Sequence, residues 1–259
     1  AGAGAGASPS PAPHASHIGE GLRDRVAVFA TVVTNFPCGI TATKNDDVPN
    51  LFAFFNFSDS DGATAAGADS GGRVAEGPLD AEINMVEGCA EDLRSVSVRL
   101  IMQRTEGAGR VHVVSPHPFV HPTAELHATA NDLKRMMQMM RWFRDRVLGH
   151  SDVEGHVYDF IPGDDIVRSD EMLEAYIRSF SEWYLHPSGS LSGSVDRRLR
   201  LHGLENVRVA DASVLPNGLP SGHPDVTIRM LGNSAAQWLM EEHVALSSAI
   251  PPPQHRAAG

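Results

Sequence analysis

Two histidines that each precede a proline are the residues of this chain best suited to acid–base chemistry. His186 and His223 flank the segment "NVRVADASVLP" (206–216), whose β-branched residues predict a strand. Loops at strand ends are common places for catalytic residues. An imidazole, which titrates near neutrality, can take a proton from an alcohol or hold a substrate oxygen. The residues alone leave two interpretations open: an acid–base pair, or histidines that cap a helix or pack in the core.

A second group of histidines is a weaker candidate for chemistry. Prolines beside these histidines interrupt any helix that would align two imidazoles, and the H-E-x-x-H motif is absent. We therefore interpret them as surface-loop residues and expect no metal site. The group comprises His112, His117, His121 and His127.

Motifs for a nucleophilic serine and for a phosphate cradle are also missing. The stretch "GSLSG" (189–193) fails the G-x-S-x-G pattern of serine hydrolases because Leu191 occupies its central position. No G-x-G-x-x-G opens a βα unit, and no G-x-x-x-x-G-K-[ST] is present. The printed sequence therefore contains no recognisable nucleotide-binding motif.

The composition excludes some classes of partner. The chain has 259 residues, is 42% hydrophobic and carries a formal charge of −11. A negative chain is a poor match for nucleic acid or for an anionic membrane surface, since both need a basic face. No apolar run approaches the roughly 20 residues that span a bilayer. Its two cysteines, Cys38 and Cys89, are too few for a disulfide framework. We interpret them as buried thiols, and a single bridge between them is the alternative.

The secondary structure that positions the histidines is predicted to be strands in the first half of the chain and helices in the second. This order, without regular βαβ alternation, predicts an α+β domain with a mostly antiparallel sheet of five or six strands and helices on one side. Apolar alternation and β-branched residues predict strands at 25–36, 50–57, 80–86, 95–103 and 110–114. Apolar residues at helical spacing predict helices at 131–149, 169–185 and 226–246.

The first of these helices carries a methionine stripe. Asn131 is expected to cap its start and Gly149 to end it. Methionines on one face can suggest a cofactor box or a soft-metal site, but packing against the sheet is the more common role. The stripe consists of Leu133, Met136, Met137, Met140 and Val147.

Both ends of the chain differ in composition from its middle. Residues 1–20 are rich in Ala, Gly, Ser and Pro and are predicted to be a disordered leader. Residues 21–243 are predicted to form one domain, in which 182–243 return to contact a cofactor, and 244–259 are predicted to be a tail. The polar stretch 58–77 is expected to be a long surface loop.

The region around the two histidines resembles the C-terminal signature of the glucose-methanol-choline (GMC) flavoprotein oxidoreductases. That signature runs H-P-x-G-T, then V-D-x-x-L-R-V-x-G, L-R-V-x-D-A-S-V-x-P, [HN]-x-x-x-T and I-G-x-x-A-A-x-x-[IL]. Several linked motifs in one order are far more specific than any single motif. The matching stretches are "HPSGS" (186–190), "SVDRRLRLHG" (194–203), "VRVADASVLP" (207–216), "HPDVT" (223–227) and "LGNSAAQWL" (231–239).

The resemblance implies oxidation of an alcohol with FAD as the cofactor. His186 matches the family's catalytic histidine, which accepts the hydroxyl proton while a hydride passes to flavin N5. His223 matches the second position, which holds the substrate oxygen. The flavin is expected to lie near Asp211 and Ala212, and beside the stretch from Pro224 and Asp225 to Val226.

The chain also departs from the family pattern. The family's dinucleotide fingerprint is missing, Ser190 replaces the usual Thr, and Arg229 stands where an apolar residue is common. The chain is then a C-terminal fragment, a split subunit that needs a flavin-binding partner chain, or a remnant. In the first two cases we expect no activity from the isolated chain. A non-redox flavin enzyme, such as a lyase or photodecarboxylase, and a non-catalytic module are the alternatives.

Overall fold

The structure is a computed structural model that describes residues 17–35, 51–56, 64–65, 81–87, 94–216 and 224–249. His223, Cys38, Cys89 and most of the expected loop 58–77 lie outside the described residues. So do residues 1–16 of the expected leader.

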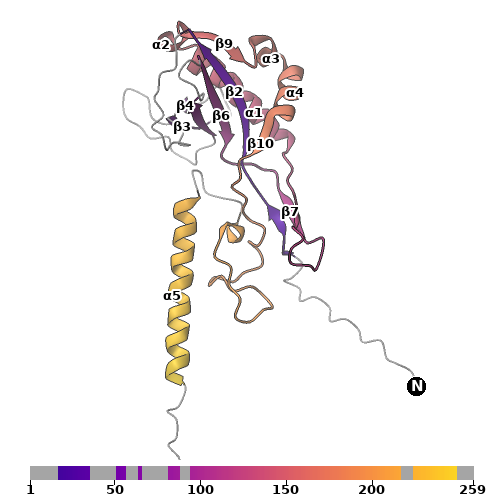
Figure 1. Cartoon of the computed structure of the whole chain (residues 1–259), viewed down its shortest axis with the longest axis vertical. Coiled ribbons are helices and arrows are strands. Elements are labelled where there is room, and N and C mark those ends of the chain that lie inside the picture. Colours follow the sequence, from indigo (N-terminus) through magenta and orange to yellow (C-terminus); the bar gives the residue numbers. More distant parts are fainter. Residues whose placement is uncertain are drawn as a thin grey trace, which may run out of the picture.

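Seven strands of the described residues form one antiparallel sheet (Figure 1). Its order is β10-β2-β6-β5-β3-β4, and β9 pairs with β2 beyond the end of β10. Only four of the five predicted strand segments lie in this sheet, because 110–114 belongs to a second sheet. The other three strands were not predicted: β4 falls in the expected loop 58–77, and β9 and β10 lie in the helical half. The strands are β2 (Val26–Thr34), β3 (Leu51–Asn56), β4 (Thr64–Ala65), β5 (Ala81–Glu87), β6 (Ser95–Met102), β9 (Val157–Ile161) and β10 (Ser181–Trp183).

A second, smaller antiparallel sheet lies below the first. It has the order β1-β7-β8, and its hydrogen bonds connect the start of the described chain to the middle. Its strands are β1 (Glu20–Leu22), β7 (Gly109–His112) and β8 (Thr123–Glu125).

Helices cover one face of the main sheet, as the α+β prediction requires. Close to this face lie α1 (Ala130–Trp142), its continuation η2 (Phe143–Leu148), α3 (Asp164–Arg168) and α4 (Asp170–Phe180). The remaining helices are α2 (Ser151–Glu154), the 3₁₀ turn η3 (Ala212–Val214) and the long C-terminal α5 (Asp225–Ala249).

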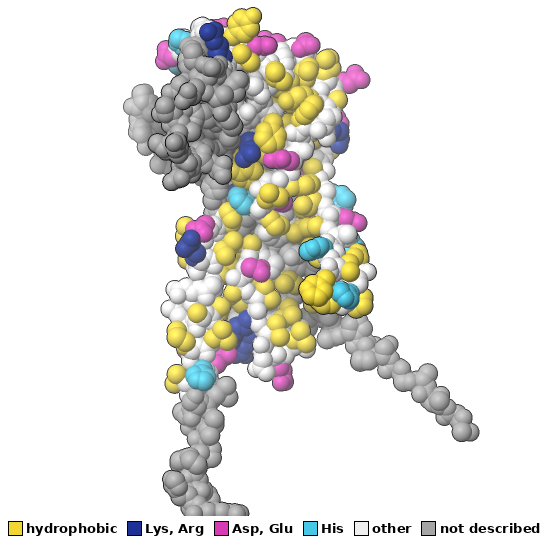
Figure 2. Space-filling model, in the orientation of Figure 1, with side chains coloured by type: hydrophobic (Ala, Val, Ile, Leu, Met, Phe, Trp, Pro, Cys, Tyr) yellow, Lys and Arg dark blue, Asp and Glu magenta, His cyan; other side chains and the backbone are white. Residues whose placement is uncertain are grey.

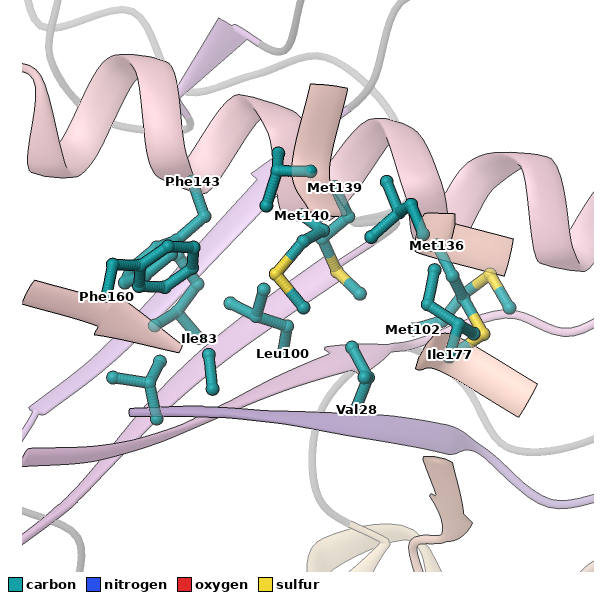
Figure 3. Packing of buried hydrophobic residues seen from close by; sticks show 14 of the residues in the cluster. Val28, Ile83, Leu100, Met102, Met136, Met139, Met140, Phe143, Phe160 and Ile177 are labelled. Carbon is teal, nitrogen blue, oxygen red and sulfur yellow. The ribbon is translucent and has the colours of Figure 1, made fainter. Parts of the chain in front are cut away.

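The core between sheet and helices explains the methionine stripe (Figure 3). Met136, Met139 and Met140 of α1 are buried against strand residues such as Val28 and Leu100. Alternate residues of β2 and β6 point into this cluster, which is the period expected of a sheet with one covered face. The core interpretation of the stripe is confirmed, with Met139 in place of the more exposed Met137.

The N-cap of α1 is Thr129, and the prediction of Asn131 is wrong. The Thr129 hydroxyl accepts a hydrogen bond from the Asp132 amide at 3.0 Å, and the Asp132 carboxylate accepts one from the Thr129 amide at 2.9 Å. This reciprocal capping box satisfies two backbone donors, which a lone Asn131 cap would not do. Gly149 does end the helical stretch, after the π-helical turn.

Two further element boundaries differ from the prediction, and in both cases strand pairing explains the difference. The predicted helix 169–185 ends at Phe180, because Ser181–Trp183 pair with the free edge of β2. The predicted strand 206–216 is largely irregular: it forms one isolated bridge, Arg200↔Arg208, before turning into η3. Which segment gains a strand partner is decided by tertiary structure rather than by local propensity.

Candidate functional site

His186 lies on a loop that leaves the edge of the main sheet. Strand β10 aligns Trp183 with Val26, and the Tyr184 amide then donates to the Arg25 carbonyl at 2.8 Å. The next residue, Leu185, has a left-handed backbone (φ 61°), which is unusual for a non-glycine residue. His186 follows this turn and is half-buried.

A buried carboxylate holds that turn in place. Oδ1 of Asp24, which is 5% exposed, accepts hydrogen bonds from the His186 amide at 2.9 Å and the Arg25 amide at 2.7 Å. Burial raises the pKa of Asp24, while the amide donors of His186, Arg25 and Leu185 oppose that rise. Asp24 therefore fixes the main chain on both sides of the strained position.

The imidazole of His186 is fixed by two side chains. Nη1 of Arg25 lies 3.4 Å from Nδ1 of His186. The Tyr184 ring meets the imidazole edge-on, with 4.9 Å between ring centroids.

The glycine of the "HPSGS" motif permits a close crossing of two chains. Gly189 has φ +86°, and a Cβ there would lie 2.6 Å from the Gly21 carbonyl oxygen. Just before it, Ser188 and Arg23 exchange two backbone hydrogen bonds of 2.8 and 2.9 Å. Any other residue at 189 would push these backbones apart.

The same loop reaches two of the predicted flavin residues. The Gly189 amide donates to the Ala212 carbonyl at 3.1 Å, and the Leu191 amide donates to the Ser213 carbonyl at 2.8 Å. Exposed Asp211 caps η3 by accepting from the Ser213 amide at 2.9 Å. The structure thus brings Asp211 and Ala212 next to the loop that carries His186.

The other predicted flavin residues open helix α5. Asp225 forms an ion pair with Arg229 one turn later, at 2.8 Å, and Val226 is 67% exposed. Pro224 precedes the helix, and its carbonyl accepts from the Ile228 amide at 2.9 Å. His223, the second predicted catalytic residue, lies outside the described residues.

Helix α5 is attached to the rest by a small core and an ion-pair cluster. Ala235 packs with Leu199 and Val214 in this core. Glu242 pairs with Arg208 at 2.6 Å and with Arg200. Hydrogen bonds from Arg208 and Arg200 lower the pKa of Glu242 to about 2.

Sequence reasoning missed Asp24 and Arg25, which contact His186 directly. They precede His186 by more than 160 residues, so no local motif connects them. One signal was present: two adjacent charges lead directly into the apolar run of strand β2. Charged residues next to a buried strand are rarely buried without a partner.

Three of the four histidines interpreted as surface-loop residues, His117, His121 and His127, are exposed, whereas His112 ends strand β7 and is half-buried. Nε2 of His112 is 3.4 Å from Oε2 of Glu125. In the part of the chain that the structure describes, no three His, Cys, Asp or Glu side chains gather as metal ligands would. No helix within the described ranges is both long and apolar enough to cross a bilayer.

Comparison with known proteins identifies the family. Residues 105–232 match the family model described as GMC oxidoreductase, in its C-terminal part. The oxygen-dependent choline dehydrogenase of Proteus mirabilis is 28% identical over 167 residues, which cover 61% of this chain and 30% of that protein. The one from Serratia proteamaculans is 31% identical over 146 residues, or 53% of this chain and 26% of the relative. The chain belongs to the GMC oxidoreductase family and corresponds to its C-terminal portion.

Solved structures agree with this fold. Formate oxidase of Aspergillus oryzae matches with a TM-score of 0.72 and 18% identity, over 89% of this chain and 48% of that chain. Pyridoxine 4-oxidase from Mesorbium loti matches with a TM-score of 0.68 and 17% identity, over 87% and 44%. At these identities the likeness establishes the fold. The chain spans about half the length of these structures and about a third or less of the matched choline dehydrogenases.

Proposed function

We propose that this chain is the substrate-binding portion of an FAD-dependent oxidoreductase that oxidises the CH–OH group of an alcohol. In this reaction His186 accepts the hydroxyl proton while the carbinol carbon gives a hydride to flavin N5. One observation supports the proposal above the others. His186 is half-buried, Asp24 holds its backbone amide and Arg25 contacts its imidazole, as a group that must meet a substrate in one orientation requires.

The chemistry of His186 follows from its surroundings. A proton transferred from the hydroxyl to Nε2 leaves negative charge on the substrate oxygen, and this charge makes departure of the hydride easier. The product is a carbonyl compound. We assign His223 to the same oxygen as a hydrogen-bonding partner, on the strength of its motif position alone.

FAD, when bound, supplies the hydride acceptor. Several described residues fit one side of such a group. Asp211 and Ala212 present a polar turn beside the His186 loop. The first turn of α5 directs backbone N–H groups outward and favours electron-rich oxygens, and exposed Val226 adds an apolar contact surface. We therefore assign Asp211, Ala212, Pro224, Asp225 and Val226 to cofactor binding.

The printed sequence has no phosphate-cradling motif, so the isolated chain is expected to retain FAD weakly and to be inactive. A flavin-binding half, in the same polypeptide or in a partner chain, would supply the cradle. The alternatives are a flavin lyase or photodecarboxylase and a non-catalytic module. They predict different products, and the experiment below separates them.

The test uses the flavin-loaded enzyme that contains this chain. His186→Gln is expected to lower kcat/KM for an alcohol by about 10²–10⁴-fold, because general-base catalysis is lost. The flavin absorption band should be unchanged, and the wild type should release a carbonyl product. The matched control is His150→Gln, since His150 caps the distant helix α2.

Each other outcome contradicts a part of the proposal. Near-normal turnover of His186→Gln would remove the base role. Decarboxylation or C–C cleavage without net oxidation would indicate the non-redox alternative. If the complete wild-type enzyme does not bind FAD, the chain belongs to a non-catalytic module.

A further inference from the structure

Four buried polar side chains lie behind His186 where the main sheet ends. Asp24 and Arg25 are 5% and 3% exposed, and Glu82 of β5 and Gln103 are fully buried or nearly so. Nε2 of Gln103 donates to Oε2 of Glu82 at 2.6 Å. Burying charges is unfavourable unless they are paired, so these side chains lower the stability of the sheet unless they interact with one another.

Arg25 stands between the buried carboxylates and the imidazole. Burial lowers its pKa, while the nearby charges of Glu82 and Asp24 raise it again. A guanidinium remains protonated in proteins and has only N–H donors. Its contact with Nδ1 of His186, at 3.4 Å from Nη1, therefore requires Nδ1 to be the acceptor.

We propose that Arg25 is the positioning residue that sets the tautomer of His186. With Nδ1 accepting from Arg25, the neutral ring carries its proton on Nε2. Nε2 is then a hydrogen-bond donor in the resting state. It can hold a substrate oxygen, but it cannot accept a proton.

The consequence for proton transfer rests on the proposed function. For His186 to accept a proton at Nε2, the ring must first carry its proton on Nδ1, and that tautomer places two donors face to face with Arg25. The guanidinium must therefore move away from Nδ1, and the carboxylate of Glu82 attracts it from the buried side. The position of the Arg25 guanidinium therefore determines whether Nε2 of His186 is a hydrogen-bond donor or can accept a proton.

The test reads the tautomer directly and needs neither flavin nor turnover. The full chain is labelled with ¹⁵N-histidine, and ring ¹⁵N–¹H correlations are recorded at a pH where the imidazole is neutral. His186→Gln identifies the signal by its loss. We expect an unprotonated Nδ1, shifted as a hydrogen-bond acceptor, and a protonated Nε2.

Substitution of the guanidinium should change that signature. In Arg25→Met the Nδ1 signal is expected to move toward that of a free acceptor or to show the Nδ1–H form, and Arg25→Lys should restore part of the shift. The control Arg99→Met removes a half-buried arginine of β6 that contacts the Phe29 ring, and it should leave the signal unchanged.

Two results would overturn the inference: a protonated Nδ1 in the wild type, or an unchanged Nδ1 signal in folded Arg25→Met. If Arg25→Met does not fold, the wild-type spectrum and Arg25→Lys decide the question. A protonated wild-type Nδ1 would leave the base role of His186 intact. Conversely, normal turnover of His186→Gln would remove the base role and leave the tautomer assignment standing.

Discussion

The main sheet and the C-terminal segment of this chain are held together in different ways. The sheet with α1 and α4 shares one continuous core, in which residues such as Leu100, Met140 and Leu173 are inaccessible to solvent. The segment 188–216 with α5 has a described core of only Leu199, Val214 and Ala235. It depends instead on backbone hydrogen bonds, close glycine crossings and the ion pairs of Glu242.

This difference in packing indicates that the main sheet is stable by itself, whereas α5 buries too few apolar side chains to be. Apolar side chains of α5 remain exposed along its length, and Figure 2 shows hydrophobic side chains over the visible face of the molecule. A helix that exposes large hydrophobic residues and buries few contributes little stability of its own. His186 lies at the junction of the two regions, so its geometry depends on both. The exposed residues of α5 are Val226, Met230, Leu239, Met240 and Val244.

The largest expected effect is a break in the core of the sheet. Phe143→Ala removes a ring that is 1% exposed and packs against Phe160 at 6.0 Å between centroids. We expect a loss of about 3–5 kcal/mol in the free energy of unfolding, measured with urea, because a large cavity remains. Phe180→Ala, at a 56% exposed site, should lose about 1 kcal/mol or less. Equal losses would show that the core does not dominate stability.

An intermediate effect is expected at the crossing beside the site. Gly189→Ala places a Cβ 2.6 Å from the Gly21 carbonyl oxygen and adds about 1–2 kcal/mol of left-handed strain. The loop should open locally, so amide exchange of residues 186–191 should accelerate more than exchange in β2. Gly155→Ala is the control, because its φ is −64° and a Cβ there meets nothing within 4 Å. Unchanged exchange in Gly189→Ala would contradict a tight crossing.

The smallest effect is expected from acid on the ion-pair cluster. The folded pKa of Glu242 is lowered from 4.5 to about 2, so its stabilising contribution is complete above about pH 4.5 and is lost as the pH falls toward about 2. Amide exchange of residues 231–238, corrected for intrinsic rates, should increase over this range. Glu242→Gln should abolish the dependence. Glu241→Gln, which removes a contact of 3.4 Å with Arg198, should largely preserve it.

Local pattern was sufficient for the main sheet and insufficient for the segments that complete it. The alternation in 95–103 predicts β6 to within one residue, because alternate residues of that strand, Val98, Leu100 and Met102, enter the core. The helical apolar pattern around Trp183 gives no sign of β10, since that strand exists only because β2 has a free edge. The valines of 206–216 suggest a strand that finds a single bridge.

The site was partly predictable for a related reason. Linked motifs identify His186 and Gly189, and the backbone explains why glycine is needed there. Asp24 and Arg25 contact His186 across a separation of 161–162 residues, so no spacing within a motif can indicate them. The proposed roles of His186 and His223 remain predictions, as do those of Asp211, Ala212 and Pro224–Val226.

The contact between Asp24 and His186 also has a consequence for the order in which the domain folds. During synthesis Asp24 and β2 leave the ribosome long before β10 does, and β2 pairs first with strands nearer in sequence. The hydrogen bond to the His186 amide closes a loop of more than 160 residues, an entropic demand that is met only after the intervening sheet and helices have formed. We therefore expect this loop to be the last part of the domain to reach its native conformation.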